Sequence, residues 1–79
     1  MNTFSYEELS VGMKAEFRQE VTPEMMAAFL CVSGDENPLH TDDSFARAHG
    51  FAARVVYGML TAALYSRLAG MYLPGERCL

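Results

Sequence analysis

A short polar stretch, Ser33–His40, carries the residues best suited to acid–base chemistry. It lies between two apolar patterns of helical spacing and contains a carboxylate, Asp35, and an imidazole, His40. A carboxylate that can take up a proton and an imidazole that titrates near neutrality form a competent pair for moving protons. Pro38 fixes its own φ and disfavours the helical conformation in the residue before it. We therefore expect a stiffened loop that aims both groups at one point.

The same residues also fit a purely structural turn. Asp and Asn side chains bond to nearby backbone groups and Pro presets φ, so Asp-x-Asn-Pro is an ordinary turn sequence. Two further carboxylates, Asp42 and Asp43, are interpreted as helix caps because acidic groups favour a helix N-terminus. Spacing alone leaves catalysis and turn structure as alternatives for Asp35 and His40.

Helices are predicted on both sides of this stretch. Thr22-Pro23-Glu24 is a helix start, with a capping hydroxyl, proline at the first position and an acidic residue at the positive end of the dipole. Gly34 can take a positive φ and so end that helix. A short helix is expected after residues 41–43 and is closed by Gly50. A longer helix is expected from Met59 to about Tyr72, and its nearly continuous apolar surface predicts burial.

One strand is predicted before the first helix. Apart from Gln19, residues 13–21 alternate apolar with charged side chains, a period of two that is typical of a strand with one wet face. The sequence offers no second strand to accept its backbone hydrogen bonds and no cover for a buried helix. The expected fold class is therefore α+β with most of the sheet absent.

Composition excludes several classes of protein. The chain has 79 residues, enough for one domain, and 51% of them are hydrophobic, which suits a piece of a larger core. A net charge of −4 and scattered basic residues argue against nucleic-acid binding. No signal peptide or membrane span is expected, and Cys31 and Cys78 are expected as free thiols in a reducing, cytoplasmic compartment. No cysteine or histidine spacing predicts a metal site.

The chain resembles the MaoC-like dehydratases and (R)-specific enoyl-CoA hydratases. The resemblance extends from about Leu9 to Pro74, and the matching residues occur in the family's order and spacing. The positions that carry it are Phe29–His40, Phe45, Ala46, Phe51 and Val55–Leu60. It implies a hot-dog fold, in which an antiparallel sheet wraps a central helix, here Met59–Tyr72. Residues 1–79 would be a single truncated domain, the N-terminal half of such an enzyme.

The resemblance also implies a site. Asp35 and His40 would form a catalytic dyad for syn hydration of trans-2-enoyl-CoA to the (R)-3-hydroxyacyl thioester, with the assignment of base and acid left open. Asn37 would orient the dyad, and the backbone N–H of Gly58 would bond to the thioester carbonyl. The substrate pocket is expected to include Pro38, Tyr57, Met59 and Ser66. No cofactor is expected, since coenzyme A is part of the substrate.

One position departs from the family. Tyr57 stands where the family commonly has His before the Gly-Met pair. It is expected either to change the polarity of the pocket or to pack as an aromatic ring under the loop.

Three functions remain open. In the first, the chain is part of an enoyl-CoA hydratase and is inactive as this fragment alone. In the second, it is a non-catalytic module that binds acyl-CoA or a partner. In the third, it is an inactive fragment that self-associates. A homodimer or larger homo-oligomer is expected, with no nucleic-acid or membrane partner.

Overall fold

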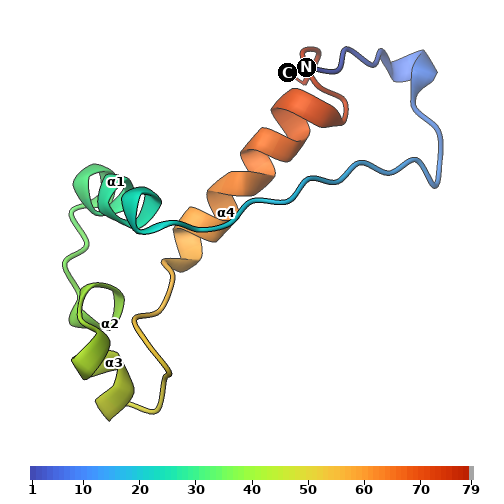
Figure 1. Cartoon of the computed structure of the whole chain (residues 1–79). Coiled ribbons are helices and arrows are strands. Elements are labelled where there is room, and N and C mark those ends of the chain that lie inside the picture. Colours follow the sequence, from blue (N-terminus) through green and yellow to red (C-terminus); the bar gives the residue numbers. More distant parts are fainter. Residues whose placement is uncertain (79) are drawn as a thin grey trace. The chain divides into compact units, whose positions relative to one another are not determined.

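The computed structural model describes residues 1–78 of the chain (Figure 1). The chain divides into two units, and each is described by itself. One unit is Glu20–Thr61, and the other joins Met1–Gln19 to the described residues from Ala62 onward. In chain order the elements are η1 (Tyr6–Glu8), α1 (Pro23–Ser33), α2 (Pro38–Thr41), α3 (Asp43–Ala48), α4 (Gly58–Arg67) and η2 (Leu68–Tyr72).

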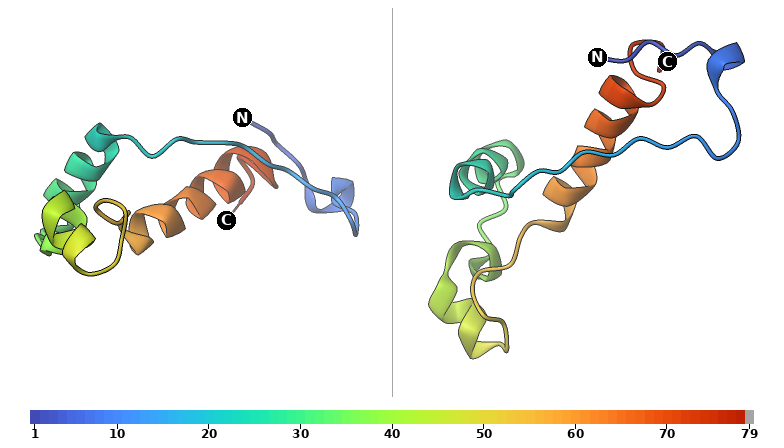
Figure 2. Two further views of the ribbon diagram at one scale, coloured as in Figure 1. Left: turned by 60° about the horizontal axis from the view of Figure 1, so that its bottom comes forward. Right: turned by 45° about the vertical axis from the view of Figure 1, so that its right-hand side comes forward.

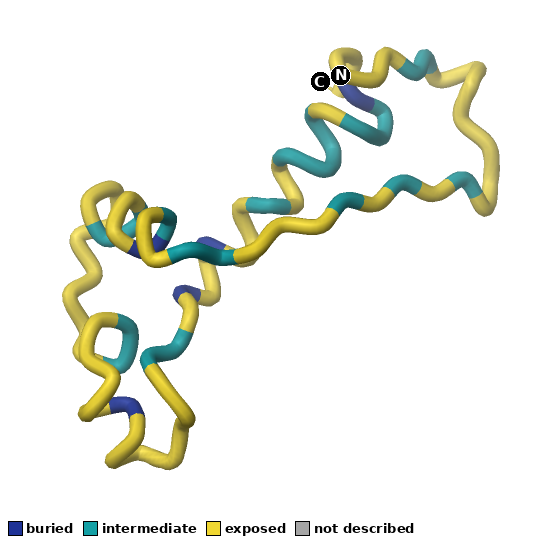
Figure 3. The backbone as a smooth tube through the Cα atoms, viewed as in Figure 1, coloured by how far each residue is buried: buried dark blue, intermediate teal, exposed yellow. Residues whose placement is uncertain are grey.

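The predicted strand does not form in the described chain. Residues 13–21 have neither helical nor strand structure, and across residues 1–78 the only β-type pairing is an isolated bridge between Thr3 and Gly75. The alternation itself is present, since Met13, Ala15 and Phe17 are half-buried and the charged residues between them are exposed (Figure 3). The strand prediction is wrong because a strand needs a neighbour to complete its hydrogen bonds, and no described segment supplies one.

Helix α1 has the ends that the sequence predicts. The hydroxyl of Thr22 accepts a hydrogen bond from the Met25 amide at 3.2 Å, and proline follows at the first helical position. At the other end Gly34 takes a left-handed conformation, with φ 71°, and its amide donates to the Leu30 carbonyl at 2.8 Å. Both ends are settled by residues within one turn, so local sequence suffices to predict them.

Two short helices follow, and one of them was not expected. The side chain of Asn37 accepts from the Leu39 amide at 2.9 Å, and Pro38 then begins α2. The prediction of a loop through His40 is therefore wrong from Pro38 onward, because cap and proline together start a helical turn. The predicted short helix is confirmed as α3, capped by the carboxylate of Asp42.

The core of the Glu20–Thr61 unit is small. Met26, Tyr57 and Leu60 form one buried cluster, and Ala46 of α3 is buried as well. Partly buried apolar side chains pack against the cluster: Val21, Met25, Phe29 and Leu30. This cluster joins α1 to the first turn of α4, and it includes Tyr57.

The helix predicted from Met59 to about Tyr72 forms as α4 followed by η2, but it lacks the predicted burial. Helix α4 runs directly into the π-helical η2, which ends at Tyr72. Leu60 is its buried residue, whereas the side chains of Met59 and Tyr65 are each 71% exposed. The expected burial is wrong in this chain because the described residues do not cover the helix. No helix within residues 1–78 has the length and apolar character needed to cross a membrane.

In the other unit, the N-terminal segment lies beside the residues that follow η2 (Figure 2). The Phe4 amide donates to the Pro74 carbonyl at 2.9 Å, and the Glu76 amide donates to the Asn2 carbonyl at 2.7 Å. Within the same unit the Arg67 guanidinium lies 4.0 Å from the centre of the Phe17 ring. Cys31 and Cys78 are exposed and free, as the sequence predicts.

Candidate active site

Asp35 is held in a turn by its own carboxylate. One carboxylate oxygen, Oδ1, accepts a hydrogen bond from the Asn37 amide at 3.0 Å, and the Asp35 amide donates to the Ser33 hydroxyl at 3.1 Å. The residue is exposed. Because the carboxylate keeps unused lone pairs while one oxygen is anchored, it can accept a further proton or hydrogen bond.

His40 is held by a backbone carbonyl. Its Nδ1 atom lies 2.7 Å from the carbonyl oxygen of Val55, and the residue is half-buried on α2. A carbonyl oxygen can only accept, so Nδ1 carries a proton and donates it. In the neutral imidazole Nε2 is then the atom with the free lone pair. The histidine is thereby set up to take a proton at Nε2.

Asn37 connects the two residues through its backbone. Its amide donates to the carboxylate of Asp35, and its carbonyl accepts from the His40 amide at 2.9 Å. Its side chain is occupied in capping α2. Asn37 thus fixes the turn that separates Asp35 from His40, by contacts with the backbone and with the carboxylate.

Tyr57 is the buried residue of the site. Only 2% of its surface is exposed, and its hydroxyl donates to the carbonyl of Asp35 at 2.8 Å. Its ring lies 4.3 Å from the imidazole of His40, with 27° between the planes, and 4.8 Å from the ring of Phe29. The pKa of the Tyr57 phenol is raised, chiefly by burial. The carboxylates of Asp35 and Glu36 also raise that pKa, while the charge of Arg54 lowers it.

Gly58 follows Tyr57 directly and begins α4. The first amides of an α-helix have no acceptor within the helix, and the Tyr57 carbonyl already takes the Thr61 amide at 3.2 Å. Gly58 is an exposed residue, and its amide makes no hydrogen bond with the described residues. Such an amide at a helix N-terminus is suited to bind an oxygen that carries negative charge.

The family of the chain follows from its sequence. Residues 7–74 match the MaoC like domain. The chain belongs to the MaoC-like domain family.

Curated relatives of this MaoC-like chain are hydratases and dehydratases. It is 43% identical over 72 residues to the (R)-specific enoyl-CoA hydratase of Aeromonas caviae. The aligned region covers 91% of this chain and 54% of that protein. It is 34% identical over 70 residues to the 3-hydroxybutyryl-CoA dehydratase of Methylorubrum extorquens. That aligned region covers 89% of this chain and 45% of the dehydratase. The MaoC-like chain therefore spans about half the length of the curated relatives it matches.

A solved structure shares the fold of the matched part. The (R)-hydratase from A. caviae involved in PHA biosynthesis superposes on the MaoC-like chain with a TM-score of 0.84 and 42% sequence identity. The superposition covers 90% of this chain and 54% of that one. The fold of the matched residues is thus similar to that of a solved (R)-hydratase.

The structure brings together only part of the predicted site. Asp35, Asn37, His40 and Tyr57 are linked in one unit, although no hydrogen bond joins the side chains of Asp35 and His40 in the described chain. Of the predicted pocket residues, Pro38 begins α2, and Met59 and Ser66 are exposed on α4. Their roles, like those of the dyad, remain predictions.

Two backbone contacts of the MaoC-like site were not predicted from the sequence. The Val55 carbonyl holds His40, and the Val55 amide donates to the Leu39 carbonyl at 2.9 Å. Every residue type has a backbone carbonyl, so the amino-acid sequence does not indicate which carbonyl makes such a contact. The packing alternative for Tyr57 is confirmed, since its ring lies among apolar and imidazole rings.

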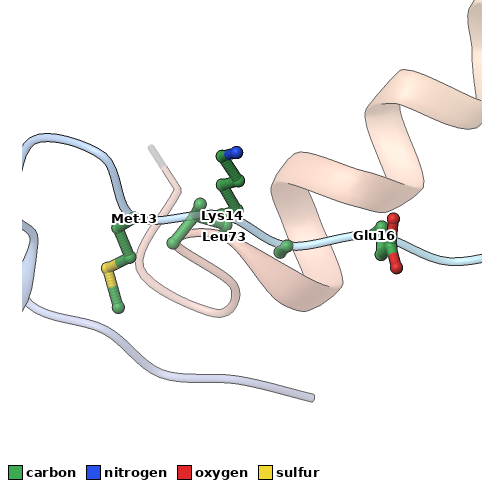
Figure 4. A pocket seen from close by; sticks show the side chains of 5 residues that line it. Met13, Lys14, Glu16 and Leu73 are labelled. Atoms are coloured by element: carbon green, nitrogen blue, oxygen red, sulfur yellow. The ribbon is translucent and has the colours of Figure 1, made fainter.

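A cavity of about 580 Å³ lies elsewhere, in the unit that holds the N-terminal segment (Figure 4). It is lined by Met13, Lys14, Ala15, Glu16 and Leu73. Its lining includes neither histidine nor any of the predicted site residues. No group of three histidine, cysteine or acidic residues suited to a metal ion occurs within residues 1–78.

Proposed function

We propose that this chain supplies the acid–base groups of an (R)-specific enoyl-CoA hydratase. The reaction adds water to trans-2-enoyl-CoA, with the oxygen going to C3 and a proton to C2, and its reverse dehydrates the (R)-3-hydroxyacyl thioester. Membership of the MaoC-like family and 43% identity to an enzyme of that name support the reaction class.

The observation that carries the proposal is the contact of His40 with Val55. It places the imidazole proton on Nδ1 and leaves Nε2 for chemistry. The carboxylate of Asp35 lies on the same turn, joined to His40 through the backbone of Asn37. One group of the pair activates water and the other handles the proton at C2. Because the two titrate as a unit, neither is assigned as base or acid.

Gly58 has the complementary role. As water adds to C3, negative charge develops on the thioester oxygen. The free amide of Gly58 would donate to that oxygen at the N-terminus of α4, where the helix dipole favours negative charge. One such donor contributes on the order of 10²- to 10³-fold in rate in other enzymes.

The second part of the proposal concerns the fold of the complete domain and the activity and association of this chain alone. Helix α4 would be the central helix of a hot-dog domain whose sheet comes from outside these residues. The exposure of Met59 and Tyr65 supports this, because such apolar surface needs a cover. The isolated chain is then expected to be inactive and to associate with further copies. The cytoplasmic location remains a prediction.

A transplant tests the proposal. Residues 7–74 replace the matched residues of the A. caviae hydratase, and hydration of crotonyl-CoA is followed by loss of the absorbance of the conjugated thioester. Asp35→Asn and His40→Ala should each lower the rate by about 10²- to 10⁴-fold. Asp42→Asn and His49→Ala are matched controls, since Asp42 caps α3 and His49 is exposed on the far end of the same helix. Normal rates in Asp35→Asn and His40→Ala would refute the assignment.

A further inference from the structure

Tyr57 contacts both members of the proposed pair, and this inference rests on the function proposed above. Its hydroxyl bonds to the backbone of Asp35, its ring stacks on His40, and its carbonyl accepts the Thr61 amide in the first turn of α4. The next residue in the chain is Gly58, the proposed thioester donor. Asp35 and His40 are therefore each one contact away from Tyr57, and Gly58 is one peptide bond away.

The burial of Tyr57 makes these contacts restrictive. Its exposure of 2% is the lowest of the three buried residues that form the cluster Met26, Tyr57 and Leu60. Phe29 of α1 lies against one part of the ring at 4.8 Å while His40 lies 4.3 Å away. A close-packed ring has few alternative rotamers, so it limits the positions open to the imidazole beside it.

We infer that Tyr57 is a positioning residue that sets the relative placement of the Asp35 turn, the His40 ring and the Gly58 amide. The hydroxyl and the ring of Tyr57 position different groups. The hydroxyl fixes the turn at the Asp35 carbonyl and so the carboxylate that the turn carries. The ring fixes the plane of the imidazole and keeps its Nδ1 on the Val55 carbonyl.

The two parts can be separated by substitution. Tyr57→Phe removes the hydroxyl and keeps the ring, whereas Tyr57→Leu removes both the hydroxyl and the stacking surface. Tyr65→Phe is the matched control, because it removes a hydroxyl from a tyrosine on α4 that is 71% exposed. The amide of Gly34, which donates to Leu30 at the end of α1, reports whether the unit remains folded.

The measurement is nuclear magnetic resonance of the full 79-residue chain, uniformly labelled with ¹⁵N so that the His40 ring nitrogens and the Asn37 and Gly34 amides are all observed. In the wild-type chain His40 should show a protonated Nδ1. Tyr57→Phe should keep that signal but speed exchange of the Asn37 amide by about fivefold, as expected for one lost neutral hydrogen bond. Tyr57→Leu should also move the Nδ1 resonance toward that of a tautomer mixture, and Tyr65→Phe should change neither.

Three results would overturn the inference. They are an unprotonated Nδ1 in the wild-type chain, an unchanged Asn37 exchange rate in Tyr57→Phe, and an unchanged His40 spectrum in Tyr57→Leu. These readouts need no turnover, so they stand apart from the proposed function. In the transplant, Tyr57→Leu should lower kcat by about 100-fold with little change in KM, as for misplaced reacting groups. A loss in Asp35→Asn without any loss in Tyr57→Leu would reject positioning and retain the function.

Discussion

The Nδ1 atom of His40 and the carbonyl oxygen of Val55 are joined at 2.7 Å across fifteen positions of the sequence. A second contact, from the Val55 amide to the Leu39 carbonyl, ties the same two segments together. The histidine therefore lies on a short helix that is bound to the segment leading into α4. This arrangement fixes which imidazole nitrogen holds the proton and which is left for chemistry.

Loss of the Asn37 side chain should loosen α2. The helix has four residues, and its cap is the Asn37 side chain. Asn37→Ala should destabilise it by about 1 kcal/mol, the usual cost of a lost N-cap, and should weaken the contact of His40 with Val55. Asn37→Asp keeps an acceptor oxygen and should retain both. The ¹⁵N spectrum of His40 measures the difference, and equal spectra in the two variants would contradict the capping role.

Ionisation of Tyr57 should oppose folding at alkaline pH. Burial is the main cause that raises its pKa above the ordinary 10.0, and a phenolate cannot donate to the Asp35 carbonyl. The folded chain thus holds a proton that the unfolded chain releases. The contribution of Tyr57 to stability is complete below about pH 10 and falls as the pH rises toward the folded-state pKa.

Ultraviolet titration of the phenols checks this. The spectrum of wild type minus Tyr57→Phe should give a titration midpoint above the ordinary phenol value of 10.0. A midpoint at that ordinary value would mean that the Tyr57 hydroxyl is not buried as described.

Gly75→Ala should destabilise the unit that holds the N-terminal segment. Gly75 is buried with φ 86°, and a methyl group there would overlap the backbone of Asn2. Gly12→Ala is the control, because Gly12 has φ 90° but open space around it. Left-handed backbone alone costs roughly 1 kcal/mol for alanine, so the larger loss belongs to Gly75→Ala. Hydrogen exchange of the Phe4 amide, which donates to Pro74, measures the loss, and equal protection in both variants would contradict the close approach.

The isolated chain should self-associate through α4. Tyr65 is 71% exposed on an apolar helix, so Tyr65→Lys should lower the mass measured by sedimentation at high concentration. Tyr6→Lys is the control, since Tyr6 is 87% exposed on η1. A monomer in wild type, or the same association in both variants, would show that α4 does not mediate contact between copies.

The sequence predicts those parts of the fold that depend on neighbouring residues. Thr22, Pro23 and Gly34 define α1 because each acts within one helical turn. Residues 13–18 alternate in burial as a strand would but form none, because pairing depends on a segment that the described chain does not contain. The same lack leaves α4 exposed.

At the candidate site, residue types and the resemblance predict roles for Asp35, Asn37, His40 and Gly58, and these roles stay predictions. The contacts of Val55 and Tyr57 required the structure, because they join positions 15 and 22 residues apart. Backbone carbonyls accept both hydrogen bonds, and a carbonyl is present at every position of the chain. Their partners therefore cannot be identified from residue types.

The central claim is that Asp35 and His40 act as one acid–base unit, and a double substitution tests it most directly. Crotonyl-CoA hydration is measured for the transplant carrying Asp35→Asn, His40→Ala or both. Groups that act as a unit are strongly non-additive, so the double variant should be about as slow as the slower single variant. Rates close to that of the unsubstituted transplant, or losses that multiply in the double variant, would contradict the account.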